Sequence, residues 1–251
     1  MSPPLVIAHR GDSAHRPENT LASFAGALEV GATVVELDVQ LTADHQPVVL
    51  HDVTLDRTTD SRGDVRRMTL AEVRAASAGY PSLFGAAWAG ERVPTLAEAL
   101  SLVRGRARVL IEVKGESVTD EVQGGVEAHA VDVVRRLEMV DQVAVISFDH
   151  RAAQHLRALA PEITRGRLFG RTTPDEMARS AADAGCSLVM PHKSQLSEAL
   201  VARARTEGLT LATWVVDEPE ELKRLARFSL YGVGSNRPGV LLEAIADGLL
   251  D

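Results

Sequence analysis

The stretch VVELDVQLTADHQPVVLHD, residues 34–52, decides the fold that we expect for this chain. It holds two runs with the composition of β-strands, 34–41 and 47–50, separated by only the short segment 42–46. A parallel crossover between two strands needs a dozen or more residues. We therefore expect these two runs to form a hairpin or an irregular antiparallel return.

Further strand-like runs alternate with helical patterns along the rest of the chain. With the opening pair, the strand-like runs cover residues 5–8, 34–41, 47–50, 109–113, 143–148, 165–169, 187–190, 209–216 and 231–235. Helical patterns cover residues 20–31, 95–102, 126–137, 151–159, 174–184, 198–207, 218–226 and 239–249. This alternation predicts an α/β fold with a parallel sheet covered by helices. A length of 251 residues favours a closed TIM (β/α)8 barrel over an open sheet, and the antiparallel return explains nine runs at eight barrel positions.

Residues 53–94 interrupt the alternation. They show weak periodicity, many charges and frequent Gly and Pro, and only Leu70–Ala76 looks helical, with Thr69 as its cap. A segment of this length after a strand end is usually a functional insertion. We expect one barrel domain over residues 1–251 that contains a small insertion at 53–94.

Composition excludes several classes of function. The net charge is −8 and no basic stripe is present, which argues against a nucleic-acid partner. No run approaches the ~18 apolar residues of a membrane span, and the N-terminus lacks the features of a secretory signal. A single cysteine, Cys186, fits a reducing compartment. We expect a soluble cytoplasmic protein without stable membrane insertion, and its oligomeric state stays open.

Charged side chains lie where a barrel has no room for them. Side chains alternate across a strand, so Glu36 and Asp38 share one face. The simplest interpretation of this pair is an amphipathic strand with a polar face in water. Other strand-like runs also carry or end in ionisable groups, namely His9 and Arg10, His51 and Asp52, and Glu112 and Lys114. In a barrel the carboxyl ends of the strands converge on one rim without a solvent face, so these groups must pair or hold an ion.

Glu36, Asp38 and Glu112 form a candidate site for a hard divalent cation. Three carboxylates at close range repel one another unless a cation lies among them. Oxygen ligands from three residues leave coordination positions for water and substrate, as Mg²⁺ and Ca²⁺ sites require. Zinc is less favoured because neither a cysteine cluster nor a close histidine pair is present.

Four further residues complete a candidate catalytic site. His9 and His51 are candidates for general acid and general base, since an imidazole titrates near neutrality. The fork of Arg10 can hold phosphate oxygens, and Lys114 adds a second positive charge. Two imidazoles, a cation and an Arg/Lys pair supply what cleavage of a phosphodiester requires.

These residues lie within motifs that resemble the glycerophosphodiester phosphodiesterase family. The motifs are His9-Arg10-Gly11, Pro17-Glu-Asn-Thr20, Glu36-Leu-Asp38, Val48-Val-Leu-His-Asp52, Leu55-Asp-Arg-Thr-Thr59, Gly63 and Ile111-Glu-Val-Lys114. The resemblance is dense over residues 5–115 and looser to about residue 240. It implies a phosphodiesterase-type TIM barrel with a small insertion after the His-Asp strand, which suits residues 53–94.

The resemblance also implies the reaction and the roles. Glu36, Asp38 and Glu112 would bind Mg²⁺ or Ca²⁺, His9 and His51 would form the acid/base pair, and Arg10 would meet the phosphate. A glycerophosphodiester such as glycerophosphocholine or glycerophosphoethanolamine would yield sn-glycerol 3-phosphate and an alcohol. The glycerol 2-hydroxyl is an alternative first nucleophile, through a cyclic phosphate. The sequence leaves open which histidine begins as the base.

The C-terminal half carries weaker signals. Phe148 and Trp214 match later strand ends at which family members place substrate-lining aromatics, and packing of the rim is the alternative. Asn236 stands where an aspartate is common in the family. We interpret the acidic run that begins at Asp217 as a favourable charge arrangement at a helix N-terminus. Asp52 is expected to orient His51 rather than only to end the strand.

Two other functions remain open from the sequence. The first is a lysophospholipase D-like hydrolase of larger glycerophospholipids, which would need an exposed apolar groove near Tyr80, Leu83, Phe84 and Trp88. The second is a catalytically silent barrel that binds a phosphorylated polyol, since a fold does not imply an activity. The presence of the whole proposed machinery argues against the second.

Overall fold

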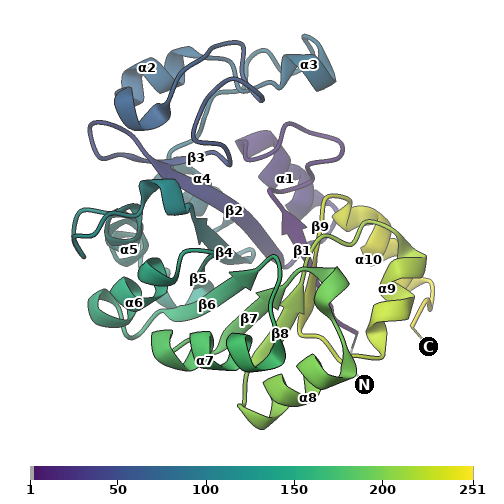
Figure 1. Ribbon diagram of the computed structural model, residues 1–251. Helices are drawn as coiled ribbons and strands as arrows, with labels where there is room; N and C mark the ends of the chain where they lie inside the picture. Colours follow the sequence, from purple (N-terminus) through teal and green to yellow (C-terminus); the bar gives the residue numbers. More distant parts are fainter. Residues whose placement is uncertain (1–2, 251) are drawn as a thin grey trace.

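A closed barrel of parallel strands forms the centre of the computed structural model, which describes residues 3–250 (Figure 1). The predicted outer limits at residues 1 and 251 lie outside the described residues. The strands are β1 (Leu5–His9), β2 (Val34–Leu41), β3 (Pro47–Val49), β4 (Arg108–Val113), β5 (Val143–Ser147), β6 (Thr164–Phe169), β7 (Leu188–Pro191), β8 (Thr210–Thr213) and β9 (Gly232–Ser235). In the described part of the chain, eight of them pair in parallel in the order β1-β2-β4-β5-β6-β7-β8-β9 and close through β9 and β1. The predicted TIM (β/α)8 barrel is confirmed.

Helices connect successive barrel strands and surround them. They are α1 (Leu21–Glu29), α2 (Leu70–Ala75), α3 (Pro81–Phe84), α4 (Leu96–Val103), α5 (Val126–Arg136), α6 (His150–Leu159), α7 (Pro174–Ala184), α8 (Glu198–Thr206), α9 (Pro219–Ala226) and α10 (Pro238–Ala246). Short 3₁₀ helices are η1 (Val65–Arg67), η2 (Gly115–Ser117), η3 (Val140–Gln142) and η4 (Lys193–Gln195). Within residues 3–250, no helix combines the length and the apolar character that crossing a membrane requires.

The opening stretch folds as an antiparallel return. β3 pairs antiparallel with β2, with Val39 opposite Val49 and Leu41 opposite Pro47. β3 therefore lies beside β2 but outside the ring of parallel strands, and it directs the chain to His51 at the rim. The prediction from the length of the connection is confirmed.

All of β2 is buried, so the interpretation of a water-facing polar face is wrong. Val35 and Leu37 pack in the apolar layer between the barrel and its helices. Val34 belongs to the cluster that fills the barrel interior. Because side chains alternate along a strand, Glu36 and Asp38 share the interior face with Val34, where both are buried away from bulk solvent.

The segment 53–94 packs as a small unit beyond β3, where Figure 1 shows α2 and α3 away from the outer helices. Its apolar side chains cluster with those of β3, and the buried members are Val48, Leu50, Leu55, Val65, Val73, Ala76, Ala78 and Val93. The predicted helix from Leu70 and its Thr69 cap are confirmed, with a full capping box to Glu72. α3 was not predicted, because four residues are too short for helical periodicity to show.

Candidate active site

Ionisable and apolar side chains share one cavity of about 150 Å³ inside the barrel. Its lining consists of Ile7, His9, Arg10, Glu36, His51, Glu112, Ile146, Phe148, Leu168, Met190, Trp214 and Gly234. A larger hollow of about 310 Å³ is lined by Val34, Arg108, Val143 and other residues at strand starts. Catalytic residues of such barrels lie at the carboxyl ends of strands, so the smaller cavity is the candidate active site.

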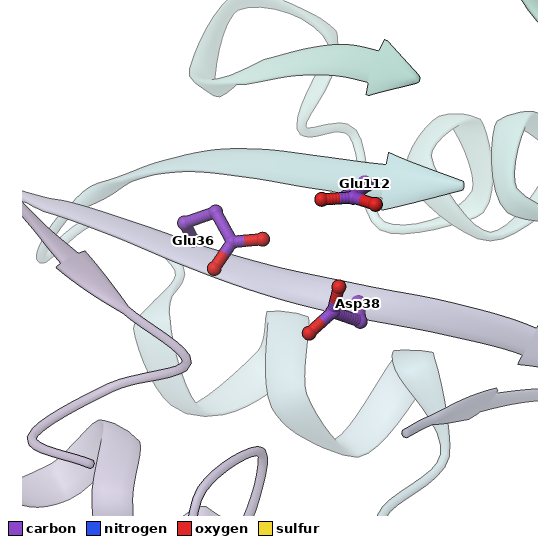
Figure 2. Close-up of side chains that lie close together, drawn as sticks. All are labelled: Glu36, Asp38 and Glu112. Carbon is purple, nitrogen blue, oxygen red and sulfur yellow. The ribbon is translucent and has the colours of Figure 1, made fainter. Parts of the chain in front are cut away.

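Three carboxylates converge at one side of this cavity. Asp38 on β2 lies opposite Glu112 on β4 in the strand register, and Glu36 precedes Asp38 by two residues. Figure 2 shows the three carboxylates turned toward one another, and one oxygen from each lies within 4.8 Å of the other two. All three residues are buried. The structure thus brings together the predicted metal ligands, and the cluster can hold a metal ion.

The electrostatics of these carboxylates fit a cation. Burial and the charge of Asp38 raise the pKa of Glu112 to about 7, and burial with the charges of Asp38 and Glu112 raises the pKa of Glu36 well above its usual range. Burial opposes ionisation of Asp38, but the charges of Arg10 and Lys114 lower its pKa. Oε1 of Glu36 is buried without a hydrogen-bond partner. An unpaired buried carboxylate oxygen is costly, and a bound cation would satisfy it.

Two cationic side chains partly balance the triad. Nζ of Lys114 lies 2.6 Å from Glu112 and 3.3 Å from Asp38. Nε of Arg10 lies 3.2 Å from Asp38, and its Nη1 donates to Glu18 at 2.9 Å. Within residues 3–250, Nη2 of Arg10 makes no hydrogen bond, so one edge of the fork is open to a ligand.

A tight turn after β1 places Arg10. Its backbone is left-handed, with φ of 57°, and its N–H donates to Glu36 at 3.0 Å. Gly11 follows with φ of 87°, and a Cβ there would lie 2.6 Å from the backbone carbonyl carbon of Ser23. Glycine is therefore required at the third position of the His-Arg-Gly motif.

His9 is held by groups of the barrel itself. Its Nδ1 lies 2.7 Å from Oδ1 of Asn236, and Nδ2 of Asn236 donates to Asp217 at 2.9 Å. The Asp217 carboxylate can only accept, which fixes the orientation of the Asn236 amide and makes Nδ1 of His9 the protonated nitrogen. Burial, and then the charge of Arg10, lower the pKa of His9 to about 4. Near neutral pH His9 is therefore uncharged, with the lone pair on Nε2.

His51 is held by a carboxylate. Its Nδ1 lies 2.6 Å from Oδ1 of Asp52, so the predicted contact between these residues is present. Because the carboxylate accepts, Nδ1 is again the protonated nitrogen. Partial burial would raise the pKa of Asp52, but hydrogen bonds from Arg57 and His51 hold it at about 2. The Asp52 carboxylate thus fixes the orientation of the His51 ring.

Phe148 and Trp214 lie together at the rim of the cavity. Their rings form an edge-to-face pair with centroids 5.6 Å apart. Nε1 of Trp214 donates to the carbonyl of Met190 at 3.0 Å, while Phe148 is 43 % exposed. Trp214 is therefore fixed by a hydrogen bond, whereas the ring of Phe148 is open to solvent beside the cavity.

The sequence assigned no part in this site to five of its residues, namely Glu18, Asn19, Arg57, Asp217 and Asn236. Glu18, Asn19 and Arg57 stand inside the quoted motifs, and that position was the available signal. Thr20 caps α1, and the amide of the neighbouring Asn19 donates to Asp38 at 2.8 Å. The acidic run that begins at Asp217 does lie at the start of α9, with Glu220 and Glu221 in the first turn, and Asp217 itself has a further role because its carboxylate accepts from Asn236.

Fold and site together define a class of enzyme. The strand ends of this closed parallel barrel place three carboxylates, two imidazoles and two cationic side chains in or beside one cavity. Such a site is equipped to hydrolyse a phosphate ester. The chain belongs to the glycerophosphoryl diester phosphodiesterase family, whose model matches residues 9–240. It is a phosphoric diester hydrolase of that family, and the resemblance seen in the motifs is confirmed.

Individual relatives agree with this assignment. A glycerophosphodiester phosphodiesterase of Caldanaerobacter subterraneus is 36% identical over 97% of this chain and 98% of that protein. The structure of an Oleispira antarctica phosphodiesterase in complex with the product sn-glycerol-3-phosphate is similar, with a TM-score of 0.89, 30% identity and 97% of each chain covered. A putative glycerophosphoryl diester phosphodiesterase of Silicibacter pomeroyi has a TM-score of 0.86 and 30% identity, covering 100% of this chain and 95% of that one.

Proposed function

We propose that this chain hydrolyses glycerophosphodiesters, such as glycerophosphocholine or glycerophosphoethanolamine, to sn-glycerol 3-phosphate and an alcohol. The observation that carries the proposal is the shared cavity, in which His9, His51, Arg10 and two carboxylates of the triad face one small volume. The product bound by the Oleispira antarctica phosphodiesterase supports the same product here. Proposed partners are therefore small molecules, with neither nucleic acid nor a membrane anchor required.

Glu36, Asp38 and Glu112 are the proposed ligands of a divalent cation, Mg²⁺ or Ca²⁺. Three buried oxygen donors without a thiolate or imidazole among them suit a hard cation. When bound, such an ion would neutralise charge on the phosphoryl oxygens and on the nucleophile.

His9 and His51 are the proposed proton-transfer pair, and their partners assign the roles. His9 is uncharged, with Nδ1–H given to the amide oxygen of Asn236, so Nε2 can accept a proton from the nucleophile. His51 donates Nδ1–H to the Asp52 carboxylate, which stabilises a positive ring that can deliver a proton to the leaving alkoxide. Within residues 3–250, Nε2 of neither ring makes a hydrogen bond, so both are available to a substrate.

Arg10 and Lys114 are proposed to bind the phosphate. The open Nη2 of Arg10 and the ammonium of Lys114 both lie beside the triad, where they can meet the oxygens of the diester. Phe148 and Trp214 are proposed to line the path of the alcohol or the glycerol, together with the apolar residues of the cavity lining.

The test is a product assay for sn-glycerol 3-phosphate from glycerophosphocholine and glycerophosphoethanolamine, run separately with Mg²⁺, Ca²⁺ and EDTA. We expect turnover with at least one ion and its loss with EDTA. Absence of turnover on a panel of diesters with every divalent ion would favour the alternative of a silent barrel that binds a phosphorylated polyol.

The lysophospholipase D-like alternative finds less support in the structure. Of the four apolar residues proposed to form a lipid groove, only Leu83 is well exposed, at 61 %. Tyr80 packs edge-to-face on Phe84, which uses these rings within the segment. Equal turnover of lysophospholipids and short diesters would contradict the preference for small substrates.

We further propose that residues 53–94 are an insertion in one barrel domain and that the protein acts in the cytoplasm.

A further inference from the structure

One guanidinium connects the supports of two active-site groups. Arg57 lies in the 53–94 segment, six residues after His51. Its Nε and Nη2 donate to both oxygens of Asp52, at 2.7 and 3.1 Å. Its Nη1 and Nη2 donate to both oxygens of Glu18, at 2.8 and 2.9 Å, and Nη1 also donates to the hydroxyl of Tyr80 at 3.3 Å. All five N–H groups of the side chain are therefore used.

Each carboxylate on Arg57 has a second partner in the active site. Asp52 accepts from Nδ1 of His51 at 2.6 Å. Glu18 accepts from Nη1 of Arg10 at 2.9 Å. A continuous path of charge-assisted hydrogen bonds thus runs from the proposed acid, through Asp52, Arg57 and Glu18, to the proposed phosphate ligand.

We propose that Arg57 is a positioning residue that sets His51 and Arg10 relative to each other by holding Asp52 and Glu18 at once. The inference deepens the proposed function, on which it rests, because it concerns how two groups come to act on the same phosphate. His51 follows β3 and Arg10 follows β1, so the barrel hydrogen bonds do not connect them directly. The guanidinium supplies that connection.

The chemistry of the link requires arginine. A planar guanidinium can meet two carboxylates in bidentate fashion, whereas an ammonium has three donors without a fixed plane. Arg57 also neutralises charge, since Glu18 and Asp52 would otherwise leave two negative groups beside Arg10 and His51. Without Arg57, Glu18 would be free to turn both oxygens toward Arg10 and draw its fork from the phosphate position.

The experiment compares Arg57→Met, Arg57→Lys and Arg74→Met in the full chain. Arg74 is a matched control, because it lies in the same segment and pairs with Glu98 on α4 at 2.6 Å, outside the cavity lining. A misplacement of about 1 Å at a reacting group can cost ~100-fold in rate. We expect Arg57→Met to lower kcat by roughly 10- to 100-fold, Arg57→Lys to recover only a small part, and Arg74→Met to retain the wild-type kcat.

A second readout separates positioning from simple stability. The ¹⁵N-coupled proton on Nδ1 of His51 should give a strongly hydrogen-bonded NMR signal in the wild type, and this signal should shift or broaden in Arg57→Met. Asp52→Asn combined with Arg57→Met should lower kcat by little more than the worse single variant, because both act on the same ring.

The outcomes distinguish the inference from the function beneath it. If wild-type protein turns over no diester, the proposed function fails, and the NMR signal alone decides whether Arg57 positions His51. If the wild type is active and folded Arg57→Met retains its kcat and its His51 signal, the positioning role is overturned. Equal losses in Arg57→Met and Arg74→Met would also overturn it, since the segment as a whole would then be responsible. Should Arg57→Met fail to fold, Arg57→Lys retains the charge and is judged by the same two measurements.

Discussion

The two histidines of the site are held in different ways by different regions of the molecule. His9, Asn236 and Asp217, here called the His9 arm, lie at or just after strands of the barrel. His51, Asp52 and Arg57, the His51 arm, lie on the return beyond β3 and in the segment that follows. In the His9 arm, the group that accepts the hydrogen bond from the imidazole is a neutral amide. In the His51 arm, that group is a carboxylate.

This difference shows how one barrel can give two identical side chains opposite tasks. A neutral acceptor in a dry setting leaves an uncharged ring, which is what a base needs. A carboxylate neighbour stabilises a charged ring, which is what an acid needs. In the proposed mechanism, the barrel wall supplies the base and the irregular segment supplies the acid.

Loss of the metal should remove the contribution of both histidines to catalysis, and it should cause the largest loss of activity. Chelation removes the charge that the proposed ligands hold beside both rings, so we expect activity to fall by about 10³-fold or more. A coupled assay for sn-glycerol 3-phosphate before and after dialysis against EDTA measures it, with re-addition of the ion as the control. Undiminished activity in metal-free protein would contradict the role of the triad.

The stability of the metal-free protein should depend on pH in a defined direction. The pKa of Glu112 is raised to about 7 in the folded chain, so its folded form binds more protons than the unfolded chain below that pH. The metal-free protein should therefore lose stability as pH rises from about 5 to about 7, and an added cation should restore it. Thermal melts with and without Mg²⁺ and Ca²⁺ test this, and a flat difference across that range would contradict it.

Removal of either imidazole should lower activity strongly, but the two variants should differ in melting temperature. His9→Ala and His51→Ala should each reduce kcat by ~10²- to 10⁴-fold, the usual contribution of a general acid or base. His51 is at the rim, so its variant should keep its Tm within a few degrees, whereas the His9 variant leaves a partner inside the barrel and should melt lower. Circular dichroism melts beside the assay measure both, and a collapse of the His51 variant would mark that ring as a core residue.

Substitutions at Asp217 and Asn236 should test whether the Asn236 amide orients the His9 ring. Asp217→Asn leaves one oxygen for the backbone N–H of Asn236 but puts an NH₂ donor where the other oxygen accepts from the Asn236 amide. The amide can then rotate and present N–H groups to Nδ1 of His9. We expect kcat to fall about 10-fold, by the logic of a displaced support. The double variant Asp217→Asn with Asn236→Asp restores an acceptor to Nδ1 and should recover part of the loss. If the double variant recovers no activity at any pH, Asp217 does not orient the Asn236 amide.

The smallest effect should appear in the acid stability that Asp52 contributes to the His51 arm. The pKa of Asp52 is held at about 2, below its unfolded value, so its contribution is present above about pH 4 and is lost as pH falls toward 2. Its side chain is 30% exposed, and solvent screening reduces the contribution to about 1 kcal/mol. Urea unfolding of wild type and Asp52→Asn at pH 5 and pH 2.5 measures it. Equal losses in the two proteins would show that Asp52 contributes nothing to this stability.

Local pattern was enough to predict the barrel and most of the cavity. The five-residue connection after residue 41 forced an antiparallel return, and β2 and β3 pair in that way. Charges on strands without a solvent face required partners, and Lys114 contacts both Asp38 and Glu112. Hydrophobic periodicity and the length of a connection predict these features because both are properties of a few consecutive residues.

What the sequence by itself determined is therefore the barrel, the antiparallel return and the set of ionisable groups at its rim. Only the tertiary structure decided which neighbour each histidine receives, since Asn236 lies 227 residues from His9 along the chain. It also decided that Arg57 joins Asp52 to Glu18 across 39 residues. Hydrogen bonds between distant residues depend on how the strands close and how side chains turn in the packed interior, and periodicity in a short window contains neither.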